Sequence, residues 1–215
     1  MTEKKQPRKY RSNLRTEAAA ATRGSILAAA RQLFVERGYA ATTMQDIAVV
    51  AGIALDTVYA SVGRKPALLR LLVETAISGR DAPVPAEERD YVVAIRAEPI
   101  ADGKLKIYAA ALTAIHQRLA PIFRVLETAS LVDSDLADWR NEISQRRADN
   151  MKLFAQDLAE TGALRADLSV QMAADIIWSM NSSEFYLLLV EQRGWPATQY
   201  ETWLADAWVR LLLEK

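Results

Sequence analysis

Apolar positions recur at intervals of three and four residues along almost the whole chain, a spacing that predicts helices. Ala, Leu, Glu, Arg and Gln dominate, and no run alternates apolar and polar residues with period two. The expected long helices are 16–37, 65–79, 88–96, 102–119, 121–131, 134–161, 169–193 and 199–213. A pair of short helices lies between the first two. The fold class is therefore all-α.

Prolines, glycines and capping residues mark the expected ends of these helices. Pro66 suits the first turn of one helix, whereas Pro121 is expected to separate two others. Ser169 is expected to cap the helix that follows it, and Thr198-x-x-Glu201 is expected to open the last helix as a capping box. Residues 81–87, with two prolines, form a linker.

The short helices within residues 42–70 form the most specific pattern, because the tight turn Ala51-Gly52-Ile53 joins them. Glycine at the reversal accepts a positive φ without steric cost. Either Thr42, in Thr42-x-x-Gln45, or Thr43, in Thr43-x-x-Asp46, caps the first helix. Such a pair sets its second helix into the major groove of DNA, or it is an ordinary hairpin of a helical bundle.

The charge distribution favours the DNA-binding interpretation. Residues 1–80 contain 13 Lys and Arg against 6 Asp and Glu, whereas residues 81–215 contain 14 against 21. A formal net charge of zero thus hides a dipolar chain whose basic half carries the hairpin, which indicates a polyanionic partner. Six basic residues lie within positions 1–15, and this segment is expected to be a disordered arm that contacts phosphates or the minor groove; the alternative is a solubilising tail.

Composition excludes several kinds of catalytic and metal site. The chain has no cysteine and a single histidine, His116, so it cannot form a disulfide, a thiolate metal site or a zinc site built from histidines. Glu-x-x-His pairs and glycine-rich phosphate loops are absent too, so we expect no enzyme, metal or cofactor. No apolar run approaches 18 residues and no signal peptide is evident, and we expect a cytoplasmic protein without a membrane partner.

The landmarks Leu33-Phe34, Gly38-Tyr39, Thr42-Thr43, Ile47-Ala48, Ala51-Gly52-Ile53, Thr57-Val58-Tyr59 and Lys65 lie within residues 22–72. This stretch resembles the N-terminal domain of TetR-family transcriptional regulators. The resemblance implies an N-terminal helix-turn-helix three-helix DNA-binding domain followed by a helical-bundle ligand-binding and dimerisation domain. It also implies a ligand-responsive repressor that binds a palindromic operator as a homodimer.

The resemblance and the basic arm together give the expected DNA-binding residues. They are Arg8, Arg11, Thr43, Gln45, Ala54, Leu55, Asp56, Thr57, Tyr59 and Lys65. Ala54, Leu55 and Asp56 stand where the family often has serine, a basic or polar residue and glycine, so base readout is expected to be modest and phosphate contacts to dominate. Asp56 is expected either to cap the second helix or to accept a hydrogen bond from cytosine.

The expected division is a basic disordered arm at 1–15, the helix-turn-helix domain at 16–64, a connecting helix at 65–80, and the ligand-binding and dimerisation domain at 88–215. Polar residues on apolar helix faces mark the expected cavity wall. The ligand-binding candidates are Tyr108, Leu112, His116, Phe123, Trp139, Ile143, Arg147, Asn150, Trp178, Asn181 and Phe185. For each of them the alternative is ordinary packing or solvent exposure. The expected effector is a small hydrophobic or aromatic molecule.

Broad apolar faces on the last two helices predict a four-helix interface between two copies of the chain, as in the family. The expected interface residues are Met180, Leu187, Trp203, Ala207, Trp208 and Leu211. The alternative is that these residues belong to the internal core. The second functional hypothesis is an architectural or interaction module that binds nucleic acid without a small-molecule ligand, and it predicts a filled core.

Overall fold

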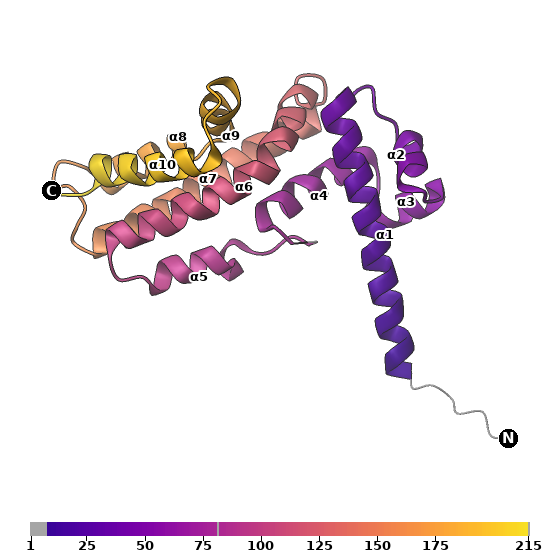
Figure 1. The fold of residues 1–215 in the computed structure, drawn as a ribbon, viewed down its shortest axis with the longest axis horizontal. Helices are drawn as coiled ribbons and strands as arrows, with labels where there is room; N and C mark the ends of the chain where they lie inside the picture. The colour runs from indigo at the N-terminus through magenta and orange to yellow at the C-terminus, as the bar shows by residue number, and fades with distance from the viewer. Residues whose placement is uncertain (1–7, 81, 215) are drawn as a thin grey trace.

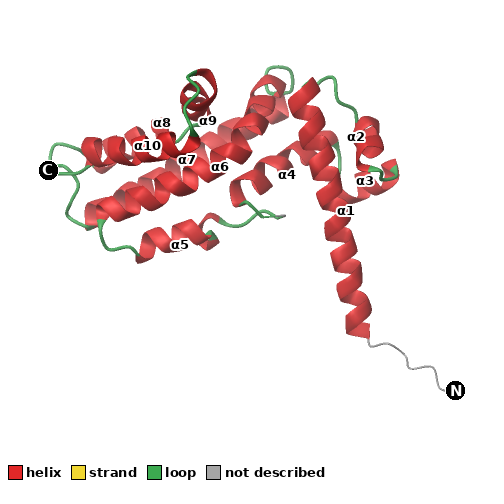
Figure 2. Ribbon diagram, in the orientation of Figure 1, coloured by secondary structure: helices red, strands yellow, loops and turns green. Residues whose placement is uncertain are grey.

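The computed structural model describes residues 8–80 and 82–214, and over this range helices joined by turns and loops form the chain (Figures 1 and 2). The elements in chain order are α1 (Arg8–Arg37), α2 (Met44–Ala51), α3 (Leu55–Val62), α4 (Lys65–Ser78), the 3-10 helix η1 (Ala86–Glu88), α5 (Asp90–Ala97), α6 (Ala101–Ala129), α7 (Ser134–Glu160), α8 (Val170–Met180), α9 (Ser183–Tyr186), the π-helix η2 (Leu187–Gln192) and α10 (Ala197–Leu212). The all-α fold class is confirmed.

The helices form two parts that α4 connects. At one end stands α1, with α2 and α3 packed along one side of it (Figure 1). In the other part α6 packs against α10, α7 packs against α8, and α5 runs beside α6. Because α4 contacts α1, α3 and α6, any shift of this helix relative to the bundle moves the short helices with it.

Two apolar clusters hold the molecule together. The N-terminal cluster joins the buried side chains of α1 to α4 with those of residues 115–129 of α6 and 136–143 of α7. The C-terminal cluster joins the first part of α6 with the later part of α7, α8, the segment 186–187 and α10. The boundary between the clusters therefore crosses α6 and α7 and does not follow the linker at 81–87.

The first helix begins earlier than the sequence pattern indicates. α1 starts at Arg8, and residues 8–15 continue the helix that was expected to begin at 16. Gly24 is the single glycine between positions 8 and 37 and no proline lies there, so each added residue extends an existing helix with one more hydrogen bond. The rest of the expected basic arm, residues 1–7, lies outside the described residues.

The expected break at Pro121 is wrong, because α6 runs unbroken from Ala101 to Ala129 with this proline inside it. A proline in a helix interior removes one backbone hydrogen bond and costs about 3 kcal/mol or more. On both sides of it, however, Leu119, Ile122 and Phe123 are buried, and each buried side chain of this size contributes about 1.5–3 kcal/mol. Tertiary packing therefore outweighs the local preference.

The expected helix 169–193 is divided, because α8 ends at Met180 and a new start follows at Ser182. Ser169 caps α8 as expected, since its hydroxyl accepts a hydrogen bond from the N–H of Met172. The expected capping box at Thr198 is wrong. α10 begins at Ala197, two residues earlier than expected and directly after Pro196, and no side chain caps it.

Candidate functional site

The start of α2 is fixed by a reciprocal pair of hydrogen bonds. The Thr43 hydroxyl accepts from the backbone N–H of Asp46 at 3.1 Å, and the Asp46 carboxylate accepts from the backbone N–H of Thr43 at 2.9 Å. Thr42 is buried instead, and its hydroxyl lies within hydrogen-bond distance of the carbonyls of Leu33 and Gly38. Of the two capping residues that the sequence allows, the structure has Thr43.

The turn itself depends on Gly52, which ends α2 with a φ of 68°. The N–H of Ile53 then donates to the carbonyl of Ala48 at 3.0 Å, so the chain reverses at once. α2 and α3 meet at a bend of 104°. This is the geometry of a helix-turn-helix, with α3 as the second helix.

α3 buries Val58 and Val62 and exposes the opposite face. Asp56, Thr57 and Tyr59 lie on that exposed face, and Tyr59 retains 44% of its accessible surface. Ala54 precedes the helix without a side-chain cap. Asp56 lies inside the first turn, so it does not cap the helix, and its carboxylate lies near the positive end of the helix dipole.

The other expected DNA-binding residues lie around this face. Thr43 and Gln45 are exposed at the start of α2. Lys65 is half-buried at the start of α4, where its ammonium lies 4.2 Å from the centre of the Tyr39 ring and burial lowers the pKa of its amino group. Arg8 and Arg11 lie in the first turns of α1, and their side chains fall outside the described part of the chain.

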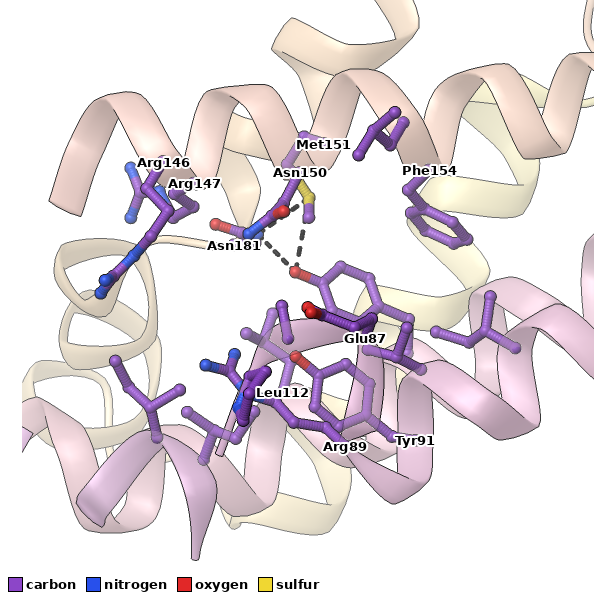
Figure 3. A pocket seen from close by; sticks show the side chains of 18 of the residues that line it. Glu87, Arg89, Tyr91, Leu112, Arg146, Arg147, Asn150, Met151, Phe154 and Asn181 are labelled. Atoms are coloured by element: carbon purple, nitrogen blue, oxygen red, sulfur yellow. Dashed lines mark hydrogen bonds between the residues drawn. The ribbon is translucent and has the colours of Figure 1, made fainter. Parts of the chain in front are cut away.

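A cavity of about 1010 Å³ lies between α4, the segment 83–92, α6, α7 and the break between α8 and α9 (Figure 3). Ligand pockets in proteins have volumes of roughly 300–1,000 Å³, so this one has room for a small organic molecule. The expected ligand-binding residues that line it are Tyr108, Leu112, His116, Phe123, Ile143, Arg147, Asn150 and Asn181.

A buried polar cluster forms one part of the cavity wall. The side-chain amide of Asn181 donates to the Tyr108 hydroxyl at 2.5 Å and approaches the Met151 sulfur at 3.1 Å. Burial raises the pKa of Tyr108, so its phenol keeps the proton and directs it towards the same sulfur, 3.4 Å away. The amide oxygen of Asn181 is buried and has no hydrogen-bond partner. It is an acceptor that a molecule in the cavity can satisfy.

His116 holds the break between α8 and α9. Its Nε2 lies 3.2 Å from the backbone carbonyl of Asn181, and its Nδ1 lies 3.4 Å from the hydroxyl of Ser183. A carbonyl can only accept, so Nε2 carries the proton and Nδ1 accepts from the serine. Burial lowers the pKa of His116 to about 4, which keeps the ring neutral at pH 7.

Arg147 brings a partly buried cation to the cavity. Its guanidinium carbon lies 4.8 Å from the centre of the Trp178 ring, and its Nε is buried without a hydrogen-bond partner. Burial lowers the pKa of this guanidinium. The indole N–H of Trp178 donates to the carbonyl of Ser144 at 3.3 Å, which fixes the ring beneath the arginine.

Three of the expected ligand-binding residues do not line the cavity. Trp178 lies behind Arg147 as described above. Trp139 is buried in the N-terminal cluster, where Arg70 lies over its ring. Phe185 stacks on Trp203 with 5.8 Å between ring centres. All three are packing residues, because their rings are engaged by neighbouring side chains.

The expected interface residues fall into two groups. Trp208 is fully buried and stacks on Tyr108 with 5.4 Å between ring centres, so the expectation that it contacts a second copy of the chain is wrong. Met180 and Leu187 are buried in the C-terminal cluster too. Trp203, Ala207 and Leu211 form a partly exposed apolar stripe on α10, and Leu211 retains 41% of its accessible surface.

Some cavity residues could not be identified from helix periodicity. Glu74 and Ile77 come from α4, and Arg89 and Tyr91 come from the segment that follows the linker. No local pattern indicates that 83–92 folds over the bundle. Phe154 lies on the same face of α7 as Arg147 and Asn150, so its spacing would have identified it.

Within residues 8–80 and 82–214, no single helix has both the length and the apolar composition needed to cross a bilayer. The bent pair α2 and α3 meets that criterion only when the two helices are taken together.

Comparison with known proteins yields a family match for the N-terminal part and a fold for the whole chain. Residues 26–72 match the family model described as bacterial regulatory proteins, tetR family. No curated protein matches the chain. Among solved structures, NalD, the secondary repressor of the MexAB-OprM multidrug efflux pump in Pseudomonas aeruginosa, is similar with a TM-score of 0.70 and 20% identity, over 93% of this chain and 99% of that one.

Two further structures show the same fold. SmeT, the repressor of the Stenotrophomonas maltophilia multidrug efflux pump SmeDEF, in complex with triclosan, gives a TM-score of 0.64 and 19% identity over 91% of this chain and 93% of that chain. The MbdR regulator from Azoarcus sp. CIB gives a TM-score of 0.65 and 20% identity over 87% of this chain and 96% of that chain. The matched residues 26–72 are those that form the helix-turn-helix and its supporting helices. Residues 26–72 therefore carry the helix-turn-helix domain of the tetR-family model, and the whole chain has the all-α fold of these solved structures.

Proposed function

We propose that the protein is a ligand-responsive repressor that binds a palindromic operator as a homodimer. The observation that carries this proposal is the position of α4. Glu74 and Ile77 of this helix line the cavity, and the same helix packs against α6 of the bundle and contacts α1 and α3 of the helix-turn-helix domain. A molecule in the cavity therefore contacts the element that supports the recognition helix.

Three polar contacts of the described residues connect α4 to the bundle, and one of them is a long hydrogen bond of 3.5 Å from Arg70 to the carbonyl of Asp135 in α7. Arg146 of α7 forms an ion pair with Glu74 at 2.7 Å, and the Nε of Arg118 in α6 donates to the carbonyl of Ala76 at 3.1 Å. An occupant that alters either contact shifts α4, and with it the spacing of the two recognition helices. Operator affinity falls only if that occupant binds the shifted conformation more tightly than the DNA-bound one.

The exposed stripe on α10 supports the homodimer. A single helix-turn-helix reads few base pairs, whereas two related by a two-fold axis read half-sites about 34 Å apart. Ala207 lies at the centre of the stripe, so Ala207→Arg is expected to shift the protein to monomers and to abolish operator binding. Thr202→Arg, on an exposed position of the same helix, is the matched control. Sedimentation velocity measures the first effect and fluorescence anisotropy the second.

The decisive experiment is selection of bound duplexes from a randomised DNA pool by the purified protein. Recovery of a palindrome with half-sites one helical turn apart supports the proposal, and the recovered duplex becomes the operator for later assays. Recovery of DNA without a common sequence refutes it.

Lys65→Ala should weaken binding to the selected duplex and to unrelated duplexes alike. It should also reduce by about one the slope of log affinity against log salt concentration.

The alternative of an architectural module without a small-molecule ligand requires a filled core. The cavity of about 1010 Å³ favours the ligand-responsive regulator over that alternative.

A further inference from the structure

The chemistry of the cavity is set by the partly buried cation Arg147. Among the described residues no Asp or Glu forms an ion pair with it, and its Nε has no hydrogen-bond partner. Charged groups withdrawn from water are normally paired, because an unpaired buried charge is strongly destabilising. Glu184 of α9 acts on Arg147 electrostatically, but it is exposed and makes no ion pair with it. The guanidinium therefore lacks an anion.

The half-buried acidic residues of the cavity wall are already paired, and the half-buried Arg89 donates its Nε to the carbonyl of Val84 at 3.1 Å. Asp157 pairs with Lys104 at 2.8 Å, and Glu74 pairs with Arg146 at 2.7 Å. The two remaining acidic residues of the wall, Glu87 and Glu160, are exposed. Water screens exposed charges far more than buried ones. The unpaired charge of the cavity interior is thus positive and comes from Arg89 and Arg147, and of these two only Arg147 has a buried donor without a hydrogen-bond partner.

The surroundings of Arg147 prepare it for a flat anion. Trp178 lies under one face of the guanidinium, and its own indole N–H is held by Ser144. The edge of an arginine offers N–H donors in a planar fork that matches a carboxylate in two parallel hydrogen bonds. Arg146, the residue directly before Arg147 in α7, adds a second guanidinium near the same end of the cavity (Figure 3).

Apolar side chains cover much of the rest of the cavity wall. Figure 3 shows Arg146 and Arg147 at one end of the α7 segment and Phe154 at the other, two turns of helix away. Leu112, Ile115 and Phe123 contribute further apolar wall from α6. The cavity therefore combines the guanidinium groups of Arg146 and Arg147 with a wall that is largely apolar, although Gln156, Asp157 and Glu160 also line it beyond Phe154.

We propose that the cavity binds an amphipathic organic anion, a carboxylate on a hydrophobic body, whose carboxylate pairs with Arg147. This inference rests on the proposed function, since it names the chemical class of the effector. The hydrophobic body extends towards Phe154, and the carboxylate competes with Glu74 for Arg146. Release of Glu74 then frees α4 at the point where it contacts α7.

The test uses two matched series that differ only in charge. One is decanoate, decanol and decylammonium, and the other is 2-naphthoate, 2-naphthol and 2-naphthylmethylammonium. Isothermal titration of the full chain without DNA should show the carboxylate of at least one series binding at least tenfold more tightly than its neutral and cationic partners, which is about 1.4 kcal/mol. Equal or weaker binding of the carboxylates, or no binding by any of the six compounds, overturns the proposal.

Arg147→Met should remove the preference for the anion while leaving the affinity for the neutral compound unchanged, which shows that the cavity is intact. Arg96→Met is the matched control, because Arg96 also lines the cavity but is exposed, and this variant should keep the preference. A preference that survives in Arg147→Met overturns the proposal. Operator binding is measured separately: carboxylate binding without loss of operator affinity refutes the ligand-responsive repressor and leaves the ligand class standing.

Discussion

Replacing Asp157 by alanine isolates the contribution of the most buried ion pair in the described structure. Lys104 of α6 is 3% exposed, and its ammonium donates to both carboxylate oxygens of Asp157 at 2.8 and 3.0 Å and to the carbonyl of Ile95 at 2.8 Å. Asp157→Ala leaves that ammonium buried with one partner. Breaking a buried pair by removing one member costs about 3–5 kcal/mol.

The lower end of that range applies here, because one third of the Asp157 side chain is exposed and water can enter where the carboxylate was. We expect a loss of about 3 kcal/mol in the free energy of unfolding. At roughly 2–4 °C per kcal/mol for a chain of this size, the Tm should fall by about 6–12 °C.

The assay is urea unfolding followed by circular dichroism, with Lys104→Met and the double variant as controls. Lys104→Met should cost much less than Asp157→Ala, because methionine has a similar shape and the remaining carboxylate reaches water. The double variant should recover most of the stability lost in Asp157→Ala. A loss below about 1 kcal/mol for Asp157→Ala, or equal losses for both single variants, would show that the unpaired ammonium of Lys104 is not destabilising.

Three further substitutions test local features of the fold. The pKa of His116 is about 4 in the folded chain against an ordinary value of 6.5, so the unfolded chain binds more protons between these values and stability decreases as the pH is lowered. The loss between pH 7.5 and 5 is about 2 kcal/mol in urea titrations, and His116→Gln should remove this component; an unchanged pH dependence in that variant would contradict it. Thr43→Ala removes the capping box and should cost about 1 kcal/mol in the same titration at pH 7.5, whereas Thr43→Ser should cost less; equal stability of all three proteins argues against the cap. Gly52→Ala should cost about 1–2 kcal/mol through its φ of 68° alone, because a Cβ there meets nothing within 4 Å, and Gly52→Asn should be milder; a neutral alanine variant would show that the turn relaxes.

Local chemistry was sufficient to predict the helix-turn-helix. The spacing around Gly52, the alternative caps at Thr42 and Thr43, and the missing cap at Ala54 all depend on neighbours within four residues. Such features are encoded next to where they act, so the sequence predicted them and left open only the choice between the two threonines and the role of Asp56.

The ends of the later helices depend on distant residues instead. The break after Met180 coincides with contacts that Tyr108 and His116 of α6 make to Asn181, and Pro121 is tolerated because of packing from other helices. The periodicity of apolar residues along the chain carries no information about these distant partners. For the same reason the sequence did not show that Trp208, which was expected at an interface between two copies of the chain, is buried against Tyr108.

The cavity was predictable from α6 and α7 but not from the segments that close it. Arg147 and Asn150 stood out as polar residues on an apolar face, and both line the cavity. Glu74 and Arg89 lie on either side of a linker whose path the sequence does not specify. The lone charge of Arg147 became evident only when the ion pairs of its neighbours were known.

The N-terminal cluster limits how the two parts of this protein can be recombined with parts of similar proteins. Protein engineers exchange sensing and DNA-reading modules by joining two chains within a linker, here 81–87. In this protein such a junction would separate α1 to α4 from residues 115–143, which complete their apolar core. A working hybrid must therefore retain this stretch of α6 and α7 with the DNA-reading module, or redesign the facing side chains of α4 to suit the new bundle.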